Sequence, residues 1–208
     1  MAKLRLIPFL LISISILYTS ATAHRNHAPG RGSRTRAYIE ASCRYTRFPD
    51  LCVRGLVDYA KVANVTLQTP QDLAEAALLV SLYRASTART FLLKAAKEYR
   101  PVKDCLDQIN LSVDELYMSI KELKQFVRET VMPHHDHDHD HHDMIYWHIS
   151  NVETWVGSAL TDASNCVDEF PGRRMSKLKA LVKAKVSNVA EVTSIALDLF
   201  HRFASRYH

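Results

Sequence analysis

The chain has 208 residues, and its 27 Lys and Arg against 22 Asp and Glu give a formal net charge of +5. A mildly basic balance of this size favours an acidic partner surface but is too weak to indicate a nucleic-acid-binding protein. With only five Gly and seven Pro, and no long stretch of alternating apolar and polar residues, the chain is predicted to be all-α.

Residues 1–23 have the pattern of a secretory signal peptide. Lys3 and Arg5 precede an apolar run from Leu6 to about Tyr18, and the small-x-small sequence Ala21-Thr22-Ala23 follows. The run is too short for a membrane anchor, and we expect no membrane span. The mature protein is predicted to be soluble and secreted, with a flexible lead-in at 24–35 and one domain at 36–208.

Residues 36–62 are predicted to form a helical hairpin that stands apart from the main core. Two short helical segments flank Phe48-Pro49-Asp50, a turn because proline disfavours helix at the residue before it. Cys43 and Cys52 lie on either side of this turn and are placed to join the two segments.

Residues 70–204 contain four long segments in which apolar residues recur every three or four positions, the period of an amphipathic helix. The second segment has such a stripe from Cys105 to Val127, and the third from Ile145 to Cys166. Short connections make consecutive helices antiparallel neighbours. The prediction is an up-down-up-down four-helix bundle.

Four cysteines allow three disulfide pairings. If the second and third helices pack antiparallel, Cys105 and Cys166 meet at one end of the pair. This geometry and the short first spacing favour Cys43–Cys52 and Cys105–Cys166. The alternative, two unrelated buried thiols, would be preferred in a cytosolic protein, but disulfides persist in secreted ones.

A loop rich in His and Asp is predicted at 133–143, between these two helices. It contains His134, His135, His137, His139, His141 and His142, with Asp136, Asp138, Asp140 and Asp143. The favoured interpretation is a solvated low-complexity insertion. A second is a pH switch, since protonating all six His changes the charge from −4 to +2. A third is opportunistic transition-metal binding, but no fixed metal-ligand set is predicted.

Two acceptor sequences for N-glycosylation are present. Asn64-Val65-Thr66 lies in a predicted loop, and Asn110-Leu111-Ser112 lies early in a predicted helix. Asn64 is therefore the stronger candidate of the two.

Three motifs occur together and in order: SCRYTRFPDLC, DCLDQINLSVDELYMSIKEL and VETWVGSALTDASNCVDEF. Together they resemble the plant invertase and pectin methylesterase inhibitors, from about Arg36 to Phe203. The resemblance implies a secreted four-helix bundle with an N-terminal hairpin and the same two disulfides. It also implies a protein inhibitor that is not an enzyme, needs no cofactor and binds its target 1:1.

The target is predicted to be pectin methylesterase. The Pro-Lys-Phe motif common in the invertase branch is absent where Met144-Ile145-Tyr146 stands, and TWVGSALTDASNC resembles the esterase branch. The expected protein is a monomer in the cell wall or apoplast that occludes the pectin-binding cleft of the enzyme. Acid invertase is the alternative target, and a secreted metal-binding protein is the alternative of a different class. No nucleophile elbow, phosphate loop or HExxH motif supports an enzyme.

The polar faces of the second and third long helices are the predicted binding surface. The candidate residues are Asp114, Ser119, Lys121, Thr154, Trp155, Ser158, Thr161 and Asp162. Trp155 adjoins the apolar stripe, so core packing competes with a role in binding. For the Ser and Thr residues, a solvated or helix-packing face is the alternative.

Overall fold

The computed structural model describes residues 31–97, 102–131, 138–170 and 176–207. These residues form six helices. They are α2 (Arg31–Cys43), α3 (Pro49–Val62), α4 (Pro70–Ala95), α5 (Val102–Val131), α6 (Asp138–Asp168) and α7 (Lys177–Ala204). The predicted signal peptide lies outside the described residues. Among the helices that are described, none combines the length and apolar character that a membrane span requires.

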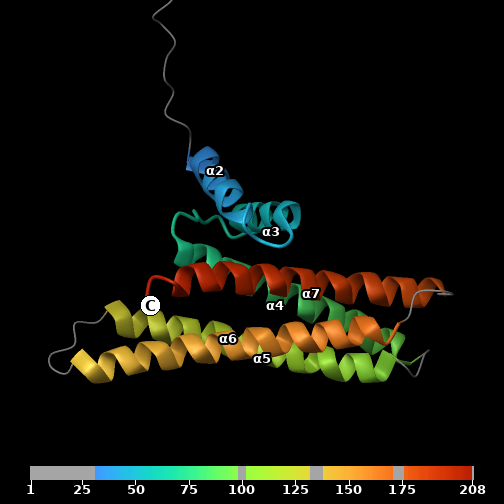
Figure 1. Cartoon of the computed structure of the whole chain (residues 1–208). Coiled ribbons are helices and arrows are strands. Elements are labelled where there is room, and N and C mark those ends of the chain that lie inside the picture. The colour runs from blue at the N-terminus through green and yellow to red at the C-terminus, as the bar shows by residue number, and fades with distance from the viewer. Residues whose placement is uncertain (1–30, 98–101, 132–137, 171–175, 208) are drawn as a thin grey trace, which may run out of the picture.

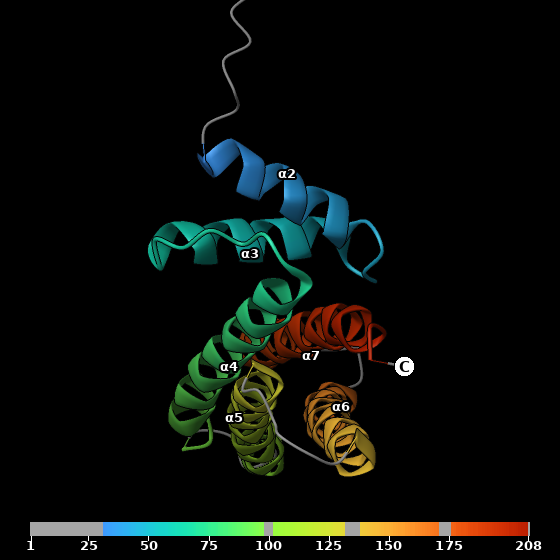
Figure 2. The same cartoon turned by 90° about the vertical axis from the view of Figure 1, so that its left-hand side faces the viewer.

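Helices α4 to α7 form a bundle in which each helix runs antiparallel to the one before it (Figure 1). The view along the bundle shows the four helices around a common centre (Figure 2). Their apolar stripes face inward, with fully buried residues such as Leu116, Val156 and Val189. The predicted all-α up-down-up-down four-helix bundle is therefore confirmed.

Local sequence signals set the starts of two bundle helices. At α4 the hydroxyl of Thr69 accepts a hydrogen bond from the Asp72 backbone N–H, and the Asp72 carboxylate accepts one from the Thr69 N–H. This capping box satisfies backbone donors that the first helical turn leaves unpaired. At α7 the hydroxyl of Ser176 caps the helix in a similar way.

Both predicted disulfides are present, Cys43–Cys52 and Cys105–Cys166. The second joins the first turn of α5 to the last turn of α6, and both of its cysteines are buried. Antiparallel packing brings these two positions together, so the disulfide fixes one end of the α5/α6 pair.

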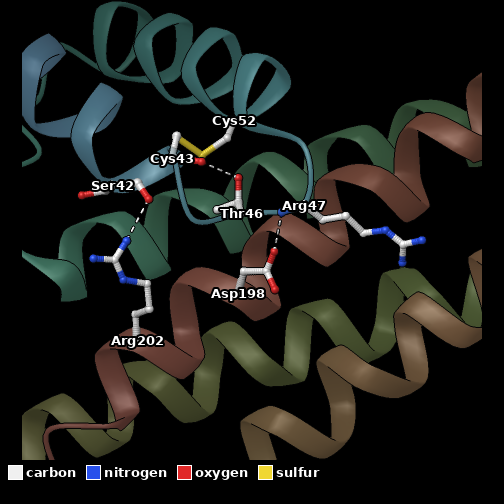
Figure 3. Close-up of a disulfide and its surroundings, with 7 residues drawn as sticks. All are labelled: Ser42, Cys43, Thr46, Arg47, Cys52, Asp198 and Arg202. Atoms are coloured by element: carbon white, nitrogen blue, oxygen red, sulfur yellow. Dashed lines mark hydrogen bonds between the residues drawn. A yellow bond between two sulfur atoms is a disulfide. The ribbon is translucent and has the colours of Figure 1, made fainter.

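Helices α2 and α3 form the predicted hairpin, which lies across the bundle on the side of α4 and α7 (Figure 2). Two hydrogen bonds connect it to α7. The guanidinium of Arg202 donates to the Ser42 carbonyl at 2.8 Å, and the Arg47 backbone N–H donates to the Asp198 carboxylate at 3.0 Å (Figure 3). Apolar residues of the hairpin also join the core of the bundle. The expectation that the hairpin stands apart from the main core is therefore wrong.

Two predicted boundaries also differ from the structure. Residues 31–35 of the predicted lead-in belong to α2, in which Thr35 and Ile39, one turn apart, are both buried. Residues 138–143 of the predicted His/Asp loop belong to α6. This segment contains no Pro or Gly to stop a helix, so α6 extends into it. Residues 133–137 of the tract lie outside the described residues.

Candidate protein-binding surface

A row of polar residues follows the outer edge of the contact between α5 and α6. On α5 it comprises Gln108, Glu115, Glu122 and Glu129, which recur every seven residues beside the core stripe. From α6 it includes His148, Asn151, Ser158 and Asp162, and Glu169 follows directly after the end of that helix. We call these nine residues the polar seam. Each of the four α5 residues bonds to a side chain among the other five.

In the middle of the seam, two carboxyl groups lie close together. The hydroxyl of Ser158 donates a hydrogen bond to one oxygen of Glu115, whose other oxygen is buried without a hydrogen-bond partner among the described residues. Burial raises the pKa of Glu115 above its ordinary value. The Ser158 hydrogen bond offsets part of this, and the Asp162 charge raises the pKa further. Burial also raises the pKa of Asp162.

Nearer the start of α6, a buried histidine lies between two carboxylates. The side chain of His148 is 2% exposed, with Nδ1 at 2.8 Å from Glu122 Oε1 and Nε2 at 2.7 Å from Glu129 Oε2. Both ring nitrogens donate only when the imidazole carries two protons. The amide of Asn151 also donates to Glu122, at 2.9 Å. This end of the seam therefore joins two carboxylates of α5 to one imidazole of α6.

Hydrogen bonds to Glu129 change its pKa in the opposite direction from that of Glu115. The hydrogen bond from Gln125 lowers the pKa of Glu129, burial opposes this change, and His148 lowers the pKa further. At the disulfide end of the seam, Gln108 donates to Glu169 at 3.1 Å. Burial raises the pKa of Glu169, and the charge of Asp104 adds to the effect.

The structure brings some of the predicted binding residues together at the seam. Ser158 and Asp162 gather around Glu115. Trp155 is partly buried and shares the helical stripe that contains Asn151, Ser158 and Asp162. On the solvent side, Thr154 and Thr161 are exposed on α6, as are Asp114 and Lys121 on α5. This arrangement leaves exposed polar groups along both sides of a partly buried row.

One predicted binding residue is misplaced. Ser119 is fully buried, and its hydroxyl donates to the backbone carbonyl of Glu115 one turn earlier. It lies on the side of α5 that is covered by α6, because it follows Ser112 by two helical turns, and Ser112 donates to the α6 carbonyl of Ala159. The prediction that Ser119 belongs to an exposed polar face is wrong.

Sequence reasoning missed Glu115, Glu122, Glu129 and the role of His148. The available signal was the seven-residue spacing of Gln108, Glu115, Glu122 and Glu129, which places polar residues at the margin of an apolar stripe. Such positions favour contacts between helices, but their partners on α6 depend on the register of the helix pair. No group of three or more His, Cys, Asp or Glu in the described part of the chain forms a metal site.

Comparisons with known proteins agree with this architecture. The model of the plant invertase/pectin methylesterase inhibitor family matches residues 37–199. Pectinesterase inhibitor 9 of Arabidopsis thaliana is 38% identical over 206 residues, which cover 95% of this chain and 92% of the relative. Pectinesterase inhibitor 11 of the same plant is 35% identical over 205 residues, covering 95% and 94%.

The fold has a counterpart among solved structures. The crystal structure of a pectin methylesterase inhibitor from Arabidopsis thaliana aligns with a TM-score of 0.50 at 15% identity, covering 79% of this chain and 95% of that one. At this identity the likeness shows the fold alone, whereas the family match spans most of the chain. The protein therefore belongs to the plant invertase/pectin methylesterase inhibitor family, whose members are inhibitors and not enzymes.

Proposed function

We propose that this protein inhibits pectin methylesterase by placing the α5/α6 face over the pectin-binding cleft of the enzyme. The observation that carries this proposal is the polar seam, with exposed Asp114, Lys121, Thr154 and Thr161 beside it. The names of the relatives at 35–38% identity and the esterase-type motif TWVGSALTDASNC support the choice of target.

The proposed inhibitor needs no catalytic group. It needs a rigid surface whose hydrogen-bonding groups already have their bound geometry, because less ordering entropy is then lost on binding. Helices α5 and α6 suit this requirement, since a disulfide joins them at one end and buried polar contacts join them toward the other. Hydroxyl and carboxylate groups on this face pair with polar groups that otherwise hold pectin.

The proposal includes a 1:1 complex of a secreted, monomeric inhibitor acting in the cell wall. Secretion is typical of the family. Light scattering during size-exclusion chromatography measures the mass of the free protein and of its complex with the enzyme. A dimeric free inhibitor, or a complex of other composition, would contradict this part of the proposal.

The decisive assay measures inhibition of a pectin methylesterase and of an acid invertase by the purified mature protein. Inhibition of invertase alone would overturn the choice of target.

To test the surface, we would compare Thr161→Arg with Thr87→Arg. Both are exposed threonines whose hydroxyls donate to the carbonyl four residues earlier, Thr161 on α6 and Thr87 on α4.

We expect Thr161→Arg to weaken inhibition at least about tenfold, the effect of losing roughly 1.4 kcal/mol of binding free energy, with Thr87→Arg unchanged. Thr154→Ala removes only one hydroxyl, so we expect a smaller loss. Circular dichroism should be the same for all three variants. If the two arginine variants inhibit equally well, the α5/α6 face is not the binding surface.

A further inference from the structure

A pocket of about 780 Å³ lies between the helices of the hairpin and the loop that follows them. Its lining includes Thr35 and Arg36 from α2 and Lys61 from α3. Its volume is in the usual range of ligand pockets, about 300–1,000 Å³. The pocket lies on the hairpin and not on the α5/α6 face, so it plays no part in the proposed inhibition.

All three residues of the acceptor sequence Asn64-Val65-Thr66 also line this pocket. They follow directly after α3, where a Schellman motif ends the helix. The Val65 N–H donates to the Ala60 carbonyl at 3.1 Å, and the Asn64 N–H donates to the Lys61 carbonyl at 3.3 Å. Asn64 has a φ of +53°, in the left-handed region, which this motif requires and which asparagine tolerates better than most residues.

The helix end therefore explains an asparagine at position 64 but not a threonine at position 66. The motif also holds the exposed Asn64 in one fixed position at the rim of the pocket. A group attached to its side chain would start at that rim. A second observation points to a polar occupant, because Thr35 lines the pocket and its buried hydroxyl has no hydrogen-bond partner among the described residues.

We infer that Asn64 carries an N-linked glycan whose first N-acetylglucosamine lies against this pocket. A sugar ring offers hydroxyl and acetamido groups to Thr35, Arg36 and Lys61. Its C–H faces can pack on the apolar part of the lining, which includes Ile39 and Val57. The glycan would then connect α2 to the end of α3, in addition to the disulfide at the other end of the hairpin.

The modification itself is a group transfer. The side-chain amide nitrogen of Asn64 bonds to C1 of the first sugar of a lipid-linked oligosaccharide diphosphate, and the bond from C1 to the phosphate oxygen breaks. The lipid diphosphate leaves, and the amide loses one proton. Both the donor and its transferase belong to the secretory pathway of the cell.

The second acceptor sequence serves as an internal comparison. Asn110 is partly exposed on α5, and the hydroxyl of Ser112 is buried against α6. A glycan on Asn110 would lie on the bundle, on a different element from the pocket. Its presence or absence does not affect the inference about Asn64.

The first test expresses the full chain in a plant or yeast host and maps glycopeptides by mass spectrometry. We expect the Asn64 peptide to carry a glycan in the natural sequence and in Thr66→Ser, and to carry none in Thr66→Ala and Asn64→Gly. Glycine preserves the left-handed residue at the helix end, so Asn64→Gly should fold normally. An unmodified Asn64 in the purified protein, whether or not it is secreted, would overturn the inference.

The second test asks whether the first sugar contacts the pocket. Protein with a high-mannose glycan is compared with protein trimmed by endoglycosidase H, which leaves one N-acetylglucosamine, and with Asn64→Gly. Because the first sugar makes the contact, hydrogen exchange in α2 and at the end of α3 should be equally slow in the first two forms and faster in Asn64→Gly. The unfolding temperature should fall by roughly 2–4 °C in Asn64→Gly.

Asn110→Gln, with Asn64 intact, is the matched control and should leave exchange in the hairpin unchanged. Equal exchange in the trimmed protein and in Asn64→Gly would mean that the sugar does not touch the pocket. That result would contradict the inference.

Discussion

The ends of the α5/α6 pair and its middle are held together by different kinds of contact. At one end the Cys105–Cys166 disulfide joins the helices without any charge. Toward the other end, His148 lies between the Glu122 and Glu129 carboxylates. In the middle, Glu115 and Asp162 face each other without an intervening cation, and burial raises the pKa of both.

Along this pair of helices, the ends contribute to stability and the middle contributes to the proposed binding. The end contacts hold the helices in register, through the disulfide at one end and the His148 contacts toward the other. The middle retains a carboxylate oxygen on Glu115 with no partner among the described residues, and predicted binding residues surround it. The part of the seam in which two carboxyl groups meet without a cation is the part we propose to face the enzyme. The contrast can be tested by changing each region separately.

The largest effect is expected from removing the disulfide at the end of the pair. Replacing Cys105 and Cys166 by Ala should lower the free energy of unfolding by about 4 kcal/mol, because the bond closes a chain segment of 61 residues. The matched control replaces Cys43 and Cys52, which are only nine residues apart, and should cost about 2.6 kcal/mol. Urea unfolding measures both, and a larger loss from the control would contradict the prediction.

Removing the His148 side chain should have the next largest effect on the free energy of unfolding. His148→Ala removes the imidazole that contacts both carboxylates and leaves the buried Glu122 with the Asn151 amide, which should cost about 3 kcal/mol of unfolding free energy. His201→Ala is the control, because its 3.4 Å contact with Glu153 joins two exposed side chains, 51% and 37% accessible to solvent. It should cost no more than about 0.5 kcal/mol. Similar losses in the two variants would mean that the His148 contact adds nothing to stability.

A substitution in the middle of the seam should have a smaller effect on stability, and that effect should depend on pH. The folded-state pKa of Glu115 is raised above 4.5, so the protein loses stability as the pH rises from about that value through the raised pKa. Glu115→Gln removes this group, and its unfolding temperature should decline less over the same interval. Parallel pH profiles for the variant and the natural sequence would show that Glu115 is not the group responsible.

The smallest effect on stability is expected from replacing Glu129, and its pH dependence should be opposite in sign to that of Glu115. The folded-state pKa of Glu129 is lowered below 4.5, so its contribution to stability is present above pH 4.5 and is lost as the pH falls through the lowered pKa. Glu129→Gln should therefore reduce the loss of stability on acidification. If both glutamine variants change the pH profile in the same direction, the contrast between the two regions fails.

Much of the fold could be predicted because it depends on local periodicity. The stripe from Cys105 to Val127 and the one from Ile145 to Cys166 define two amphipathic helices, and antiparallel packing alone then brings the cysteines together. The boundary error at Arg31 has a different origin, because the burial of Thr35 and Ile39 depends on contacts with other parts of the chain, which no local pattern reveals. The error at Asp138 does not, since the absence of Pro and Gly from 138–143 is visible in the sequence.

The seam could be predicted only in part. The chain itself specifies which residues of α5 lie beside its core stripe, since helical periodicity places Glu115, Glu122 and Glu129 on one edge. Tertiary structure alone decides which side chains of α6 they meet, because that depends on the register and rotation of the two helices. It also decides that Ser119 is covered while Thr161 is exposed. The pKa values of the carboxyl groups follow from those neighbours and from burial, so they too depend on the packed bundle.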